Sequence, residues 1–198
     1  MHASVATAEL SSIRASAIGY LQYLRTLLDA VDLDQLEAVV SVLRCARQRG
    51  AAVYIVGNGG SAATASHFAT DLANLSRRLG KPPLKVVSLV DNTARLTALA
   101  NDTGYANVFS EQLEALAEPG DVLIAISASG NSPCLLRAAE VSRARGLTTI
   151  GLLGFDGGAL LELVDLAIHV RSLPGVYGPV EDVHVALAHM VAACLAEV

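Results

Sequence analysis

Two short segments of small, glycine-rich and hydroxylated residues each follow an apolar run. The first is GNGGS, Gly57–Ser61, and the second is SASGNS, Ser127–Ser132. A helical pattern follows each one, and Pro133 stands where a first helical turn tolerates proline. Backbone N–H groups at a helix N-terminus, the helix dipole and serine hydroxyls together bind anions. The second segment therefore predicts an anion site, although an ordinary strand-to-helix turn also uses Ser, Gly and Asn.

A separate group of side chains has the chemistry for proton transfer or metal binding. His67 and Asp71 are four residues apart and share one face of a predicted helix. Such a pair can act as acid and base or ligate a metal, and it is also common as a plain surface ion pair. Glu181 and His189 are eight residues apart, roughly 12 Å along a helix axis. They can meet one ligand only by reaching from two sides or by coming from different subunits.

The glycines of the first segment allow a second interpretation. Gly57, Gly59 and Ala62 satisfy a loose dinucleotide-binding pattern, and Asp91 follows the next predicted strand as a ribose-binding acid would. Asp91 lies well beyond the usual spacing, however, and a dinucleotide does not explain the serine segment. One phosphate plus a polyol, bound in a single pocket, accounts for both segments.

Composition limits the partners of this chain. Its 198 residues are 53% hydrophobic and only 4% aromatic, and the net charge is −5. An acidic chain argues against a nucleic-acid surface and gives no long-range attraction for a phosphorylated ligand, so local donors must hold any phosphate. The length suits one domain, residues 1–198, with a helical pair over 1–50 and an α/β core with a terminal helix over 51–198.

The three cysteines, Cys45, Cys134 and Cys194, are widely spaced and form no CxxC motif. That pattern predicts buried thiols in a reducing compartment. The first residues lack the basic and apolar regions of a secretion signal, and no apolar run reaches membrane-spanning length. We therefore expect a soluble, cytoplasmic protein with no membrane partner.

Hydrophobic periodicity predicts which elements position these residues. Residues from about Val5 to Gly50 form two amphipathic helices, which either cover a sheet edge or pack on another subunit. The later strands are expected at Val53–Val56, within 81–90, at Val122–Ile126, Thr148–Gly154 and Asp165–Val170. Helices are expected at about Ala62–Leu79, Asn92–Ala100, Tyr105–Ala117, after Pro133 and at Val180–Val198, with a loop over 172–179. This alternation predicts an α/β fold: a doubly wound, flavodoxin-like, five-stranded parallel sheet with ligands at the carboxyl ends of its strands.

Five segments together resemble the sugar isomerase (SIS) phosphosugar-binding family, and within it the phosphoheptose isomerases. They are GNGGSAATASHFATDL, ALANDTGYANVF, DVLIAISASGNS, GFDGG and VEDVHVALAH, and they occur in the family's order. The resemblance runs from about Val53 to His189. It implies an isomerase that converts sedoheptulose 7-phosphate to a heptose 7-phosphate, in a homotetramer with active sites between subunits.

The resemblance also implies roles for individual residues. The substrate-binding positions would be Asn58, Gly59, Gly60, Ser61, Asn101, Asp102, Ser127, Ala128, Ser129, Ser132 and Glu181. The catalytic positions would be Asp71, Glu181 and His189. Some members carry zinc, which here would fall on His67, Asp71, Glu181 and His189.

Three positions depart from the family pattern. The isomerases usually have glutamate where this chain has Asp71, and glutamine where it has Glu181. The shorter Asp71 withdraws a base by about one methylene, which can cost a proton-transfer enzyme about a hundredfold in rate. Glu181 adds a carboxylate that could restore the base from the opposite side of the substrate or strengthen metal binding. Ala128 replaces a common hydroxyl residue and is expected to cost at most one phosphate hydrogen bond.

Two alternatives to this activity are compatible with the sequence. One is a non-catalytic SIS module that binds a phosphosugar as a sensor or binds a partner protein. Retention of two histidines and two carboxylates favours the enzyme, because buried ionisable groups are costly to keep without use. The other is the same chemistry on a different sugar phosphate, such as a hexose or octose phosphate.

Overall fold

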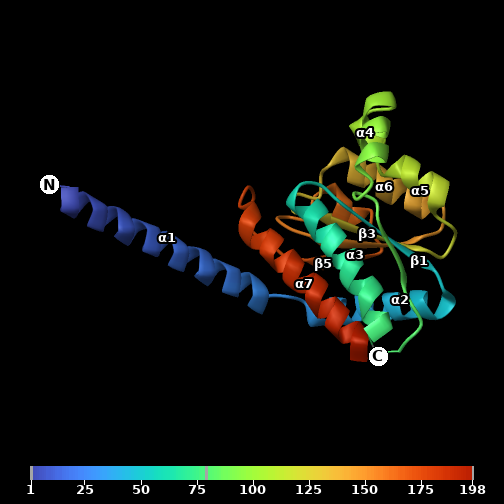
Figure 1. Ribbon diagram of the computed structural model, residues 1–198, viewed down its shortest axis with the longest axis horizontal. Helices are drawn as coiled ribbons and strands as arrows, with labels where there is room; N and C mark the ends of the chain where they lie inside the picture. Colours follow the sequence, from blue (N-terminus) through green and yellow to red (C-terminus); the bar gives the residue numbers. More distant parts are fainter. Residues whose placement is uncertain (1, 79, 198) are drawn as a thin grey trace.

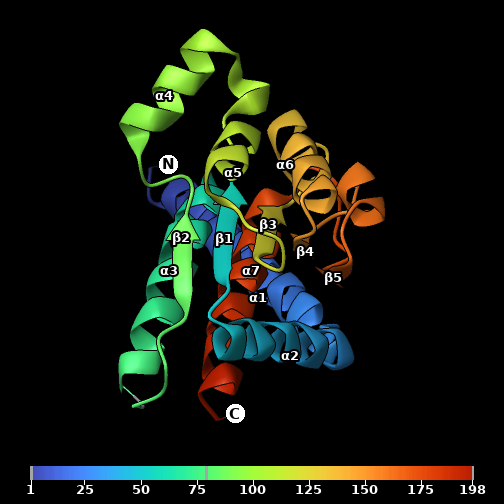
Figure 2. The ribbon, with the colours of Figure 1, turned by 90° about the vertical axis from the view of Figure 1, so that its right-hand side faces the viewer.

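The two polar segments flank the switch point of a parallel sheet. The computed structural model describes residues 2–78 and 80–197. Its strands are β1 (Ala52–Gly57), β2 (Lys85–Ser88), β3 (Val122–Ser127), β4 (Thr148–Leu153) and β5 (Leu166–His169), all paired in parallel in the order β2-β1-β3-β4-β5 (Figure 2). The chain turns outward from β1 to β2 and then returns to β3 on the other side of β1. Because β1 and β3 are neighbours, the loops that follow them meet at the switch point, where such folds bind ligands.

Helices cover both faces of this sheet (Figures 1 and 2). They are α1 (His2–Asp29), α2 (Leu33–Arg49), α3 (Gly60–Arg78), α4 (Thr93–Asp102), α5 (Ser110–Leu116), α6 (Pro133–Ala144) and α7 (Tyr177–Glu197), with short 3₁₀ turns η1 (Tyr105–Asn107) and η2 (Ala159–Glu162). Helices α2, α3 and α7 pack on one face, and α5 and α6 pack on the other. The predicted doubly wound, five-stranded α/β architecture is confirmed.

Alternating side chains of the strands build the two cores. In β1, Val53 and Ile55 point toward α3 and α7, whereas Tyr54 and Val56 point toward α5 and α6. The whole of β3 is buried, as expected for the central strand of a sheet that is covered on both faces. The core is aliphatic, as the low aromatic content predicts, and this rigid centre holds the loop that follows β3.

Two helix boundaries differ from the sequence predictions. Helix α7 begins at Tyr177 rather than Val180, because Pro179 lies in its first turn, where a missing N–H is tolerated. The single helix predicted over 105–117 is broken: the amide of Val108 donates to Tyr105 in a 3₁₀ turn, and α5 begins only at Ser110.

Helix α1 extends away from the body of the molecule (Figure 1). Its C-terminal part contacts the body, where Leu27 is buried and Tyr20 donates a hydrogen bond of 2.5 Å to Asp182 of α7. Along the same helix, Ile13, Ile18 and Leu21 are each more than half exposed, at 64%, 55% and 62%. Within the helical pair, α2 packs on the sheet, whereas these side chains of α1 are left exposed.

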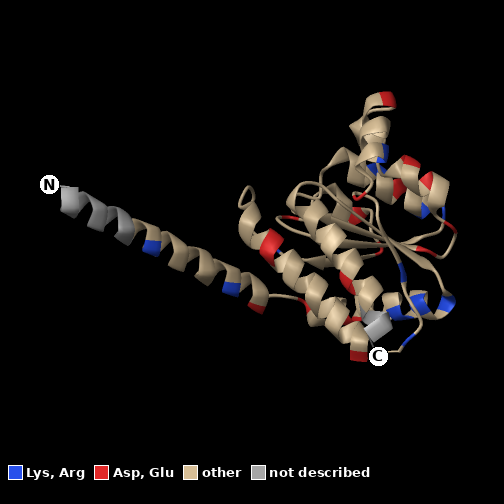
Figure 3. Ribbon diagram, in the orientation of Figure 1, with Lys and Arg blue, Asp and Glu red and all other residues tan. Residues whose placement is uncertain are grey.

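Helix α7 is long and apolar enough to span a membrane by length and composition, the one such helix in the described part of the chain. Half of its most apolar window is buried inside the molecule, as in the core helix of a globular protein. Charged residues are scattered over the surface, and basic ones gather at the end of α2 (Figure 3). That end of α2 faces away from the carboxyl ends of the strands (Figure 2).

Candidate active site

The serine segment after β3 forms a turn with hydroxyl groups left for a ligand. Ser127 accepts a hydrogen bond from the amide of Gly130 at 2.9 Å, which leaves the serine proton free to donate. Ser132 is the N-cap residue of α6, and its side chain makes no capping hydrogen bond. Its hydroxyl is therefore available beside the positive end of the helix dipole.

The loop that follows β4 packs against the serine segment and is hydrogen-bonded to it. Gly130 has a left-handed backbone, with φ of +63°, and a side chain there would overlap the carbonyl of Gly157. The carbonyl of Gly130 accepts the amide of Leu160 at 2.9 Å, and the Asn131 side chain accepts the amide of Ala159 at 2.9 Å. The GFDGG motif thus supports the serine segment, and the close approach of Gly130 to Gly157 requires glycine.

Glu181 lies against the start of α3. A side chain at Gly60 would overlap the Glu181 carboxylate, so glycine is required for this approach. The carboxylate therefore sits at the N-terminus of α3, where the helix dipole favours a negative charge. Since His67 farther along α3 meets His189 farther along α7, the two helices run parallel and side by side.

These pieces enclose one small pocket of about 140 Å³ at the switch point. Its walls are Asn58, Ser61, Ile126, Ser127, Ala128, Ser129, Ser132, Leu135, Tyr177 and Glu181. The described residues that line it include no lysine or arginine, so hydroxyl and amide groups must hold any anion. The pocket has two chemically different sides: the hydroxyl-rich loop at the start of α6, and the Glu181 carboxylate.

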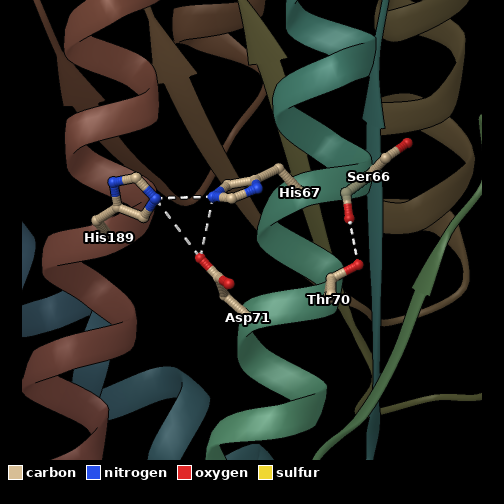
Figure 4. Close-up of polar contacts among 5 residues, drawn as sticks. All are labelled: Ser66, His67, Thr70, Asp71 and His189. Atoms are coloured by element: carbon tan, nitrogen blue, oxygen red, sulfur yellow. Dashed lines mark hydrogen bonds and ion pairs between the residues drawn. The ribbon is translucent and has the colours of Figure 1, made fainter.

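A second cluster lies farther along α3 and α7 (Figure 4). The Nε2 atoms of His67 and His189 are 2.7 Å apart, and Asp71 Oδ2 lies 3.2 Å from the first and 3.7 Å from the second. All three ligand atoms fall within 4.8 Å of one another, and the side chains are 49%, 55% and 33% exposed for His67, His189 and Asp71. The cluster can hold a metal ion, and it opens toward the outside of the subunit.

Glu181 does not join this cluster within one subunit. Seven residues separate Gly60 from His67, which is about two helical turns, or roughly 10 Å along α3. Among the described residues, the group that could hold a metal contains only His67, Asp71 and His189. The structure thus places three of the four predicted metal ligands together, and it places Glu181 at the pocket with the glycine and serine segments.

Seven of the eleven predicted substrate-binding residues line the pocket, whereas Gly59, Gly60, Asn101 and Asp102 do not. Asn101 and Asp102 are hydrogen-bonded to each other at 2.8 Å at the exposed end of α4 and are not among the pocket residues. Asp91, the acid of the dinucleotide alternative, accepts a hydrogen bond from Ser66 of α3 and also lies outside the pocket.

Tyr177 lines the pocket and was not predicted from the sequence. Its ring packs edge-on against Phe155, with the ring centres 5.1 Å apart. The sequence assigned Tyr177 to a loop, but it lies four residues before Glu181 on the same helix. A helix start placed at residue 177 would have put both side chains on one face.

The chain is similar to known proteins in both sequence and fold. Residues 19–154 match the model of the SIS domain family. Phosphoheptose isomerases from Mycobacterium bovis and Trichlorobacter lovleyi are 41% and 44% identical to this chain; the first match covers 84% of both chains, and the second covers 71% of this chain and 70% of the relative. The structure of the phosphoheptose isomerase from Neisseria gonorrhoeae superposes with a TM-score of 0.81, at 29% identity, over 97% of this chain and 99% of that one. The chain belongs to the SIS domain family, in its phosphoheptose isomerase branch.

Proposed function

We propose that this enzyme isomerises sedoheptulose 7-phosphate to D-glycero-D-manno-heptose 7-phosphate. The observation that supports this most directly is the pocket at the switch point, where an anion-binding serine loop and one carboxylate, Glu181, face a common space. Similarity to named phosphoheptose isomerases supplies the substrate class.

The two sides of the pocket suggest how the sugar lies. The serine loop, with Ser127, Ser129 and Ser132, holds the distal phosphate by neutral donors and the dipole of α6. The negative charge of Glu181 repels the phosphate from its own side, so the uncharged end of the sugar lies there. Binding energy from the phosphate then aligns the reacting carbons with the base.

In this proposal Glu181 is the base. It takes a proton from C1 of the ketose while the C2 oxygen gains one, which gives the enediol. Loss of the O1 proton and return of a proton to C2 then give the aldose. Asp71 is the weaker candidate, because it lies outside the pocket between two imidazoles.

We assign the cluster of His67, Asp71 and His189 as a zinc site. A tetrahedral ion with bonds of about 2.0 Å places its ligands about 3.3 Å apart, close to the spacing of these atoms. Three ligands leave one coordination position open, as in catalytic zinc sites. Bound there, zinc would polarise sugar oxygens as a Lewis acid.

We also propose a cytoplasmic homo-oligomer, a tetramer as the family resemblance implies. The exposed cluster lies about two helical turns from the pocket of its own chain, so His189 can move the hydroxyl proton only at a pocket of a neighbouring subunit. The exposed apolar side chains of α1 supply a surface for that association. Three free cysteines suit a reducing compartment.

The test is product identification by NMR. The purified protein is incubated with sedoheptulose 7-phosphate, and in parallel with hexose and octose phosphates, before chelation, after chelation and after addition of zinc. Formation of the heptose 7-phosphate, lost on chelation and restored by zinc, is the expected result. No aldose from any of these sugars, with or without zinc, would exclude the isomerase; full activity after chelation would exclude the zinc.

A further inference from the structure

The side-chain amide of Asn58 is hydrogen-bonded to two residues that do not line the pocket, Tyr105 and Cys134. The Tyr105 hydroxyl donates to Asn58 Oδ1 at 2.8 Å. On the other side, Asn58 Nδ2 donates to the sulfur of Cys134 at 3.2 Å. The sulfur is 3.7 Å from Oδ1, so the nitrogen is the nearer amide atom and the two contacts agree on one orientation.

The three residues come from three different elements around the switch point. Asn58 follows β1, Cys134 lies in the first turn of α6 and is buried, and Tyr105 begins η1, the turn after α4. Of these, only Asn58 is among the residues that line the pocket. Helix α4 and the turn η1 lie beyond the carboxyl ends of the strands (Figure 2). The hydrogen bond from the Tyr105 hydroxyl to Asn58 therefore connects this part of the chain to the pocket.

The two short contacts leave part of the hydrogen-bonding capacity of the Asn58 amide for a ligand. Its nitrogen has two N–H groups and uses one of them for the Cys134 sulfur. Its oxygen has two lone pairs; one accepts from the Tyr105 hydroxyl, and the other meets only the Cys134 thiol, a weak donor 3.7 Å away. One N–H is therefore unused, and one lone pair has only the long thiol contact, so a ligand can still meet a donor and an acceptor here. A sugar carbon that bears a hydroxyl group offers the matching acceptor and donor, whereas a phosphate offers acceptors only.

We propose that Tyr105 and Cys134 are positioning residues that fix the plane of the Asn58 amide, so that it binds hydroxyl groups of the sugar rather than the phosphate. This inference rests on the proposed function, because it takes the ligand to be a sugar phosphate. Burial raises the pKa of Tyr105 and of Cys134, so both groups keep their protons at neutral pH, and the phenol remains a donor.

Tyr105→Phe tests the proposal, because it removes the hydroxyl and keeps the ring. We expect KM for sedoheptulose 7-phosphate to rise about tenfold, the equivalent of one lost hydrogen bond, while kcat stays within about threefold. The inhibition constant of inorganic phosphate should not change, because the serine loop is untouched. Cys134→Ala should raise KM by less, since a thiol is a weak acceptor.

Tyr54→Phe is the matched control. Tyr54 also donates its hydroxyl to one partner, the carbonyl of Leu116 at 2.9 Å, but it lies away from the pocket. Its removal should lower the melting temperature without changing KM. A merely structural role for Tyr105 would give the same pattern as this control and would overturn the proposal.

The decisive comparison is made in an Asn58→Ala background. If Tyr105 acts through Asn58, then Tyr105→Phe causes no further rise in KM once Asn58 is gone. An equal rise in both backgrounds, or no rise in a folded Tyr105→Phe protein, would show the proposal to be wrong. If the wild type is inactive, only the proposed function fails, and the same variants are then compared by calorimetric binding of sedoheptulose 7-phosphate. If the wild type does not bind this sugar phosphate either, the proposed function and the role of Tyr105 are both wrong.

Discussion

At the scale of single residues, the two carboxylates that depart from the family pattern occupy different places. Their substitutions suggested one base that had moved from Asp71 to Glu181. The structure places Glu181 in the pocket beside the serine loop and Asp71 between two histidines. The four-residue spacing predicted that His67 and Asp71 share one face of a helix, because that relation depends on local structure alone. It could not predict that Glu181 lies against Gly60, since that contact joins distant parts of the chain.

His184 makes the stability of the fold depend on pH. Its side chain is fully buried, and neither ring nitrogen has a hydrogen-bond partner among the residues that the structure describes. Burial lowers the pKa of His184 from 6.5 to about 4; the nearby Leu153 carbonyl opposes this only in part. Between these pH values the unfolded chain binds a proton that the folded chain does not, so stability falls as the pH is lowered.

We expect the titration of His184 to lower the free energy of unfolding of the wild type by about 3 kcal/mol in total as the pH falls from 6.5 to 4. Urea unfolding at several pH values measures it, with His184→Leu as the comparison because leucine cannot titrate. The difference between the two proteins should grow steadily as the pH falls below 6.5. A constant difference across that range would mean that His184 is solvated or charged in the fold.

At the scale of elements, the strands and the loops that follow β1 and β3 could be predicted from the sequence. Short apolar runs followed by Gly, Ser and Asn identify strand ends without any tertiary information. The start of α7 could not be placed in this way, because Gly178 and Pro179 are residues typical of loops. Packing decides that boundary: Tyr20 of α1 lies over Gly178 and hydrogen-bonds Asp182, which holds the first turn of α7 in place.

Helix α1 is expected to be an association element. Replacing Ile18 and Leu21, which are exposed at 55% and 62%, by glutamate puts charge on its apolar surface. We expect the double variant to shift from tetramer toward dimer or monomer in light scattering after size-exclusion chromatography, and to lose activity at the same time. The subunit fold itself should be unchanged by circular dichroism, because neither side chain belongs to the cores.

Ser16→Glu is the matched control for this surface. Ser16 is also exposed on α1, and its hydroxyl bonds only to the carbonyl of Ser12 one turn earlier. It should leave the oligomer intact. A monomeric wild type, or an Ile18/Leu21 variant that stays fully assembled, would contradict the role given to this helix.

At the scale of the whole molecule, the described residues that line the pocket include no positively charged side chain. The net charge is −5, yet the described residues around the pocket supply neutral donors and a single carboxylate, while arginines gather at the far end of α2. Composition predicted that local donors must hold any phosphate; the lining of the pocket offers such donors, and phosphate binding there stays a prediction. Residue patterns could not predict that the cluster of His67, Asp71 and His189 lies apart from the pocket, because the packing of α3 on α7 joins distant parts of the chain.

The central claim is that Glu181 in this pocket isomerises a heptose phosphate, and the rate of aldose formation from sedoheptulose 7-phosphate tests it most directly. NMR follows the reaction for the wild type, Glu181→Gln and Asp71→Asn, each with and without added zinc. We predict that Glu181→Gln lowers kcat at least about a hundredfold and that zinc does not restore it, as for loss of a general base. Asp71→Asn should be partly restored by excess zinc. A wild type that forms no aldose, or a Glu181→Gln protein as fast as the wild type, would contradict the account.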